Sequence, residues 1–257
     1  MEKPNRLVVV DIGSHKLEEL LVLLGPFSRQ FGVYAKWAAR KCLKAILRAN
    51  FSTLSKIGRQ MEVIRYYFLT RREYHLQVIS IEPNTSVVQP YIEKLSKKHL
   101  VHYLPAAVLG HDAETDVELK ALFFYNHSIS SSIYKRDRLP NHEKARVCIG
   151  LKFDLLWENL IKIGALNTDD PFLLRMNCEG AELGVIEGCL HKGLKPICII
   201  GSIGDVGKIH GKQANDKTRE ILDEMETPYF YFKGDDPSTW YDMITVWDKY
   251  TSSYRKK

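Results

Sequence analysis

The stretch PFLLRMNCEGAELGVIEG, from Pro171 to Gly188, shows most directly how this chain folds. It begins with a short apolar run, which is typical of a strand buried on both faces of a parallel sheet. It ends with the apolar spacing of a helix. Between the two, the chain places Asn177, Glu179 and Glu182 around a glycine–alanine pair. Ligands of open α/β sheets bind where strands end, so these polar residues are candidate site residues.

The same alternation of strand and helix runs through most of the chain. Short apolar runs predict strands at Leu7–Ile12, Leu76–Ile81, Leu100–Tyr103, Phe172–Met176 and Pro196–Ile200. Amphipathic patterns predict helices at Lys16–Leu24, Thr85–Lys97, Lys152–Ile163, Ala181–His191 and Asn215–Glu226. We therefore expect an α/β fold with a doubly wound, mostly parallel sheet. Near the C-terminus, TPYFYFKG (227–234) is interpreted as a further strand, TWYDMITVWDKY (239–250) as a last strand or helix, and SYRKK (253–257) as a frayed tail.

Composition and charge narrow the class of protein. The chain has 257 residues, a net charge of +6 and five cysteines that form no CxxC pair. An odd number of unpaired cysteines argues against a disulfide framework or zinc knuckle and favours a reducing compartment. No apolar run is long enough for a signal peptide or a membrane span, and no ligand spacing indicates a metal site. We expect one cytoplasmic domain over residues 1–257.

A basic segment interrupts the alternation over residues 25–74. It reads as helical, and between Arg29 and Arg72 it carries eleven lysines and arginines against one acid, Glu62. Its amphipathic pattern predicts an apolar face of Ala35, Ala38, Ala39, Cys42, Leu43 and Ile46, and an opposite face of Lys36, Arg40, Lys44 and Arg48. The basic face could simply be solvated, or it could bind anionic lipid or a phosphate-bearing substrate. Nucleic acid is disfavoured because no recognisable binding module accompanies the segment.

Two further strand ends carry polar residues. In VVVDIGSHKLEELL (8–21) a strand ends at Asp11, and Gly13 precedes a helix start, as in nucleotide-binding turns or a plain strand–helix turn. A dinucleotide fingerprint needs three glycines and only Gly13 is present, which disfavours a nucleotide-dependent oxidoreductase. In QVISIEPNTSVVQPYIEKL (77–95) Glu82 ends a strand, where an acid can bind ribose hydroxyls or interact with the helix dipole.

Taken in order, these motifs resemble those of the FkbM-like, S-adenosylmethionine-dependent methyltransferases. RMNCEGAELGVIEG resembles the family pattern K-[IM]-[DN]-x-E-G-A-E-x-x-x-L-x-G, DIGSHKLEEL its first motif and VISIEPN its second. Three weaker likenesses follow in the family order: LPAAVLGHDAETDVEL (104–119) to a hairpin, NHSISSSIY (126–134) to a serine-rich loop, and ARVCIGLKFDLLWENL (145–160) to a V-x-x-x-x-L-D-x-L-L segment. The resemblance covers about Leu7 to Ile200, apart from the basic segment.

The resemblance implies a Rossmann-like class I methyltransferase fold, with the basic segment as a helical insertion after the first helix. It implies S-adenosylmethionine as cofactor and O-methylation of a hydroxyl on a sugar or natural product, hence a saccharide or small-molecule acceptor. The implied cofactor-binding residues are Asp11, Gly13, Ser14, His15, Glu82, Pro83 and Ala106. The implied catalytic residues are Asn177, Glu179 and His210, with Glu179 or His210 as the base. The implied substrate contacts are Glu182, Asp205 and Lys208.

The sequence departs from the family pattern at three places. Leu17 stands where a second glycine is expected, and Arg175 and Asn177 replace the commoner lysine and aspartate. Gly201–Gly211 lacks the spacing of a phosphate loop, and we interpret it as a mobile loop on the acceptor side or a glycine-rich surface loop. These departures leave an alternative: a scaffold that kept the fold, lost the chemistry, and uses the basic segment on an anionic membrane surface or nucleic acid.

Overall fold

The computed structural model describes residues 6–24, 27–70, 76–125, 130–134, 143–232 and 236–252. They belong to two compact units, which we name the sheet unit (Met1–Lys16 and Leu76–Tyr231) and the helical unit (Leu17–His75 and Phe232–Lys257). The expectation of one domain over residues 1–257 stays a prediction. Within the described ranges, every helix is too short or too polar to cross a membrane.

The sheet unit is built on a six-stranded sheet with the order β10-β9-β8-β1-β2-β3, and its strand pairs are parallel. The strands are β1 (Leu7–Ile12), β2 (Leu76–Ile81), β3 (Leu100–Leu104), β8 (Phe172–Met176), β9 (Ile199–Gly201) and β10 (Tyr229–Phe230). Strands β1, β2 and β8 are buried along their whole length, as expected for continuous apolar runs. The predicted α/β class and mostly parallel sheet are confirmed.

The order of the sheet reverses beside β1. From β1 the chain continues outward through β2 and β3 on one side, and returns through β8, β9 and β10 on the other. The carboxyl ends of β1 and β8 therefore form a topological switch point, where ligands of open α/β sheets bind.

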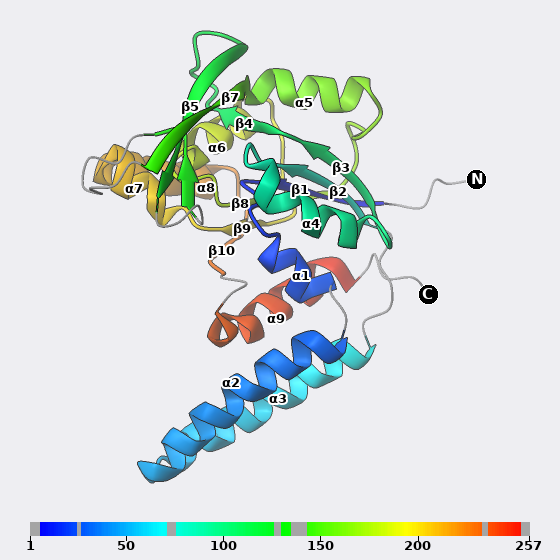
Figure 1. The fold of residues 1–257 in the computed structure, drawn as a ribbon, viewed down its shortest axis with the longest axis vertical. Helices are drawn as coiled ribbons and strands as arrows, with labels where there is room; N and C mark the ends of the chain where they lie inside the picture. Colours follow the sequence, from blue (N-terminus) through cyan, green and yellow to red (C-terminus); the bar gives the residue numbers. More distant parts are fainter. Residues whose placement is uncertain are drawn as a thin grey trace. The chain divides into compact units, whose positions relative to one another are not determined.

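Helices flank this sheet (Figure 1). They are α4 (Thr85–Leu95), α5 (Phe153–Lys162), α6 (Glu182–His191), α7 (Gly204–His210) and α8 (Lys212–Glu224). Helix α5 packs on α6, α6 on α8, and α8 on α7. Val8, Val10 and Ile12 of β1 share one core cluster with Phe153 of α5 and Val185 of α6. The loop predicted over 201–211 is wrong for most of its length, because residues 204–210 form α7.

A smaller four-stranded sheet with the order β4-β7-β5-β6 completes the unit. Its strands are β4 (Ala106–Leu109), β5 (Val117–Tyr125), β6 (Ser130–Ser132) and β7 (Glu143–Lys152). The hairpin expected over 104–119 is wrong: β7 lies between β4 and β5, pairing parallel to β4 and antiparallel to β5. Within the serine-rich stretch, residues 130–132 form β6, whereas 126–129 lie outside the described residues.

The helical unit contains α1 (Glu18–Leu24), α2 (Phe27–Leu47), α3 (Phe51–Thr70), a short 3-10 helix η1 (Pro237–Thr239) and α9 (Trp240–Thr251). Helices α2 and α3 form a long helical hairpin, and α9 contacts both α1 and α3 (Figure 1). Its core includes Tyr34 and Trp240, whose stacked rings lie 6.2 Å apart between centroids. The helical interpretation of the basic segment is confirmed for 27–70; residues 25–26 and 71–74, like the tail 253–257, lie outside the described residues.

The apolar face predicted for the basic segment is wrong at Ala39, Leu43 and Ile46, which are exposed. Ala38 and Ala45 are buried, but Leu43 and Ile46 are 59% and 60% exposed. Tyr34 is buried as well, so the inward face of α2 runs through Tyr34, Ala38 and Ala45, and the small alanines allow close helix packing. The predicted basic face is exposed as expected, at Lys36, Arg40, Lys44 and Arg48.

Candidate functional site

The loops that follow β1, β8 and β9 start side by side at the carboxyl edge of the parallel sheet. The Asn177 amide donates to the Ile12 carbonyl over 3.0 Å, and the Ser202 amide donates to the Met176 carbonyl over 3.2 Å. Parallel pairing thus brings together residues from three distant parts of the chain. We take this edge as the candidate site.

The turn after β1 requires a residue without a side chain. Gly13 has φ +72°, and a Cβ there would lie 2.2 Å from the Asn177 carbonyl oxygen. His15 and Leu17 also have positive φ, at 45° and 54°. Leu17, which stands where the family pattern has glycine, thus keeps the left-handed conformation that glycine adopts at lowest cost.

Asp11 lies in a buried ion pair. Its Oδ1 is 3.0 Å from Nη1 of Arg175, its neighbour in the β1–β8 register, and side-chain exposure is only 1% and 3%. The same Nη1 donates to the Gly13 carbonyl over 2.6 Å. Arg175 therefore fastens the end of β1 and the turn after it to β8. The carboxylate of Asp11 is therefore paired with Arg175, and the contact between Asp11 and a cofactor stays a prediction.

Glu82 links the end of β2 to the turn after β1. Its Oε2 accepts from the His15 amide over 3.0 Å and its Oε1 from the Asn84 amide over 2.8 Å, while 4% of the residue is exposed. Each carboxylate oxygen has two acceptor positions, so the group retains hydrogen-bonding capacity for a ligand hydroxyl. Pro83 follows in the loop and is partly exposed.

Two of the other predicted cofactor residues face inward. The Ser14 hydroxyl donates to the Asp11 carbonyl over 2.9 Å and accepts from the Ser80 hydroxyl over 2.8 Å. Ser14 and Ala106 are buried, with exposures of 0% and 2%. Both therefore shape the walls of this edge, and direct cofactor contact stays a prediction.

The loop after β8 is organised by Glu182. Its Oε1 accepts from the Cys178 amide over 2.9 Å and its Oε2 from the Gly180 amide over 2.7 Å, and the residue is fully buried. Burial raises the pKa of this carboxyl to about 7, although backbone hydrogen bonds, including the one from Gly180, oppose the shift. Glu182 was predicted to contact substrate, but its carboxylate is turned into the loop that it supports. Asn177 and Glu179 remain partly exposed at the same edge.

Helix α7 brings His210 to this loop. Its Nε2 lies 2.9 Å from the Gly180 carbonyl oxygen, and its ring packs edge-on against Tyr134 with 4.9 Å between centroids. A carbonyl only accepts, so Nε2 must carry the proton, and Nδ1 of the neutral ring is the nitrogen that can take up another. On α7, Asp205 and Lys208 are paired with each other over 2.5 Å, and their substrate contacts stay predictions.

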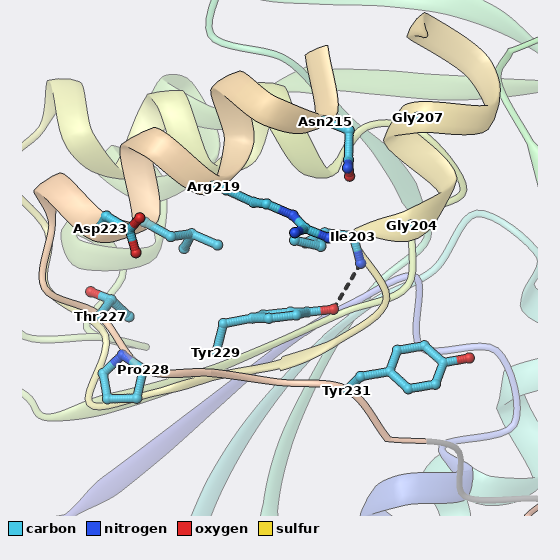
Figure 2. Close-up of a pocket in the computed structure, with 11 residues that line it drawn as sticks. Ile203, Gly204, Gly207, Asn215, Arg219, Asp223, Thr227, Pro228, Tyr229 and Tyr231 are labelled. Carbon is cyan, nitrogen blue, oxygen red and sulfur yellow. Dashed lines mark hydrogen bonds between the residues drawn. The ribbon is translucent and has the colours of Figure 1, made fainter. Parts of the chain in front are cut away.

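A cavity of about 770 Å³ lies between β10 and helices α7 and α8. Figure 2 shows Arg219 extending from α8 towards Tyr229, whose hydroxyl accepts from the Ile203 amide over 2.9 Å. The same hydroxyl donates to the Gly201 carbonyl over 2.8 Å, and burial raises its pKa to about 12. No motif predicted this cavity; the only sequence signal is the pair Tyr229 and Tyr231, which alternation places on one side of a strand.

Three potential metal ligands meet elsewhere in the sheet unit. Ligand atoms of His111, Asp154 and His191 lie within 4.8 Å of one another. Asp154 already accepts from His111 over 2.8 Å and lies 3.5 Å from the Lys192 ammonium. Burial favours the neutral acid, but these two partners hold the pKa of Asp154 below its usual range. Because Asp154 is already paired with His111 and the Lys192 ammonium, we assign no metal here, and the absence of a metal site stays a prediction.

Comparison with known proteins adds no relative: no protein-family model, no curated protein and no solved structure matches the chain. The structure does bring most of the predicted residues to one edge of the sheet. Gly13, His15, Glu82, Asn177 and Glu179 belong to loops joined by hydrogen bonds at the switch point. His210 joins them through Gly180. Asp11, Ser14 and Glu182 lie behind this surface as supporting residues.

Proposed function

We propose that this chain is an S-adenosylmethionine-dependent O-methyltransferase with a class I, Rossmann-like fold that acts on a hydroxyl of a saccharide or small natural product. The observation that carries the proposal is Glu82: an acid at the end of β2, hydrogen-bonded to the glycine turn after β1 and beside a topological switch point. A carboxylate in that place suits the two hydroxyls of a ribose. The ordered motifs of the FkbM-like family supply the choice of cofactor.

The residues at the edge fit such a cofactor. In the proposal Glu82 holds the ribose hydroxyls, and the turn at Gly13, which packs closely against the Asn177 carbonyl, shapes the methionine end. Bound there, S-adenosylmethionine would supply the methyl group for transfer to the acceptor oxygen. Asp11 acts indirectly, because Arg175 holds it against the turn.

An acceptor hydroxyl needs help to lose its proton during transfer. His210 is the first candidate base, since its Nε2–H is held by the Gly180 carbonyl and Nδ1 can accept a proton. Glu179, partly exposed in the same loop, is the second. The nearby cavity supports an acceptor site: tyrosine rings suit the faces of sugars, and Arg219 and Asn215 offer hydrogen bonds.

The test is isothermal titration of the full-length protein with S-adenosylmethionine. We expect binding by the wild type and loss of binding by Glu82→Ala, with Glu82→Gln as a milder second variant. Glu93→Gln, an exposed glutamate on α4, is the matched control and is expected to bind like the wild type. Far-UV circular dichroism shows whether each variant is folded. No heat from the folded wild type at millimolar cofactor would overturn the proposal.

One observation favours the scaffold alternative. Arg175 forms a buried ion pair with Asp11, so the Asp11 carboxylate is not presented to a bound cofactor as it would be in an active site. The same titration separates the two functions, because a scaffold has no reason to bind the cofactor or to lose that binding when Glu82 is replaced.

A further inference from the structure

The net positive charge of this protein resides in the helical hairpin α2–α3. Over residues 27–70 the hairpin has nine lysines and arginines against one acid, Glu62, out of 37 and 31 in the whole chain. The rest of the chain therefore has slightly more acids than bases. Charge concentrated in this way on one element indicates an anionic partner.

The turn of the hairpin also exposes large apolar side chains. Leu43, Ile46, Leu47 and Phe51 are 59%, 60%, 78% and 74% exposed, and all lie within nine consecutive residues. We call these four residues the apolar tip. Single exposed apolar residues are ordinary, but four adjoining ones mark a contact surface.

The apolar tip is presented by an ordered turn. The Asn50 side-chain oxygen accepts from the Thr53 amide over 3.0 Å and from the Ser52 hydroxyl over 2.9 Å, which caps the start of α3. The Asn50 amide in turn donates to the Ala45 carbonyl over 2.9 Å. Near the turn, the buried side chains of the hairpin are Ala45 of α2 and Ile57 of α3, whereas the four tip residues are exposed.

Basic side chains surround the apolar tip. Arg40, Lys41, Lys44, Arg48 and Lys56 are all exposed, and residues 27–61 contain no acid. This combination fits the surface of an anionic bilayer, whose headgroups attract lysine and arginine while its acyl region receives apolar side chains. Nucleic acid would satisfy the charges and leave the apolar tip in water. A second copy would cover the tip but bring an equal positive charge against it.

We propose that the apolar tip and its basic surround dock this protein on anionic lipid bilayers, with the leucines and Phe51 entering the headgroup–acyl boundary. The surface is independent of the proposed function, because it uses no residue of the candidate site. Loss of lipid binding and loss of cofactor binding are therefore separate results.

The test is flotation of the full-length protein with vesicles of phosphatidylcholine alone or with about 30% phosphatidylserine, a typical anionic fraction. We expect binding to the anionic vesicles, weak binding to the neutral ones, and loss of binding as salt rises. Leu47→Ser is expected to weaken partitioning about tenfold or more, because a leucine leaves the apolar phase. Leu69→Ser, at the other end of the hairpin and 59% exposed, is the matched control with no expected change.

A charge variant tests the second half of the surface. Lys44→Gln with Arg48→Gln is expected to weaken partitioning about 30-fold, at roughly fivefold for each cation near an anionic surface. Lys97→Gln with Lys98→Gln, two exposed lysines of the sheet unit, is the matched control. All replaced residues are exposed, so the variants are expected to fold, which circular dichroism verifies.

Three results would overturn the proposal. The first is no binding of wild type to anionic vesicles at low salt. The second is equal binding of Leu47→Ser and wild type to the anionic vesicles, which would show that the surface is purely electrostatic. In that case, binding of a short DNA or RNA duplex that Leu47→Ser does not affect would identify nucleic acid as the partner. The third is a dimer in sedimentation experiments that Leu47→Ser dissociates, which would identify a second copy.

Discussion

The buried carboxyl of Glu182 makes the stability of the sheet unit depend on pH. Its pKa is raised to about 7 in the folded chain from an ordinary value of 4.5, chiefly by burial. The folded state thus binds this proton more tightly than the unfolded chain does. The resulting stabilisation is fully present below about pH 4.5 and is lost as pH rises through 7.

The magnitude follows from the two pKa values. One pKa unit corresponds to about 1.4 kcal/mol, so Glu182 lowers the free energy of unfolding by about 2.5 kcal/mol between pH 5 and pH 8. Glu182→Gln removes the ionisation. Its amide oxygen can accept from only one of the Cys178 and Gly180 amides, which costs about 1–3 kcal/mol at every pH.

The assay is urea unfolding followed by far-UV circular dichroism at intervals from pH 5 to pH 8. The quantity of interest is the free energy of unfolding of wild type minus that of Glu182→Gln, because the other titrating groups cancel in it. We expect this difference to fall by about 2.5 kcal/mol across the range. Glu220→Gln, an exposed glutamate on α8, should track the wild type throughout. A difference for Glu182→Gln that is constant with pH, or that rises, would refute the reasoning.

Other substitutions test the remaining supports of the fold by urea unfolding. Asp11→Ala leaves the buried Arg175 guanidinium without its carboxylate and is expected to cost about 3–5 kcal/mol; a much smaller loss would show that the pair contributes little. Gly13→Ala places a Cβ 2.2 Å from the Asn177 carbonyl oxygen and is expected to cost several kcal/mol, and wild-type stability would contradict the close approach. At Gly58, in helix α3 with no atom within 4 Å of an added Cβ, alanine is expected to stabilise by about 1 kcal/mol, and destabilisation would contradict the open helical position.

The strands of the parallel sheet could be predicted because a strand buried on both faces has a continuous run of apolar residues in the sequence. The bounds predicted for Leu7–Ile12, Leu76–Ile81 and Phe172–Met176 agree with β1, β2 and β8. Helix α7 was missed because Gly204 and Gly207 lower helix propensity. Packing against α8 outweighs that preference, and such packing cannot be seen in a local window.

The candidate site was predictable in its location and less so in its details. Strand ends with polar residues indicated the edge that the structure assembles. Which way each side chain turns depends on partners far along the chain: Asp11 faces Arg175 only because of the β1–β8 register. The position of Glu182 in the sequence marks it as an acid in the first turn of a helix. That position is the same whether the carboxylate faces a ligand or its own loop, so the sequence alone cannot predict its direction. The face of α2 was misjudged for a similar reason, since periodicity does not say which side meets α3.

The placement of β1 at the centre of the sheet has a consequence for synthesis on the ribosome. Asp11 and Arg175 are 164 positions apart, so at about 5–20 residues per second β8 emerges roughly 8–30 seconds after β1. During that interval one side of β1, which is apolar except for Asp11, lacks its β8 neighbour. The helical hairpin, by contrast, is complete within 44 residues of its first position. The growing chain therefore completes the charged hairpin before β1 gains its β8 neighbour, and we expect β1 to be a binding site for chaperones during that interval.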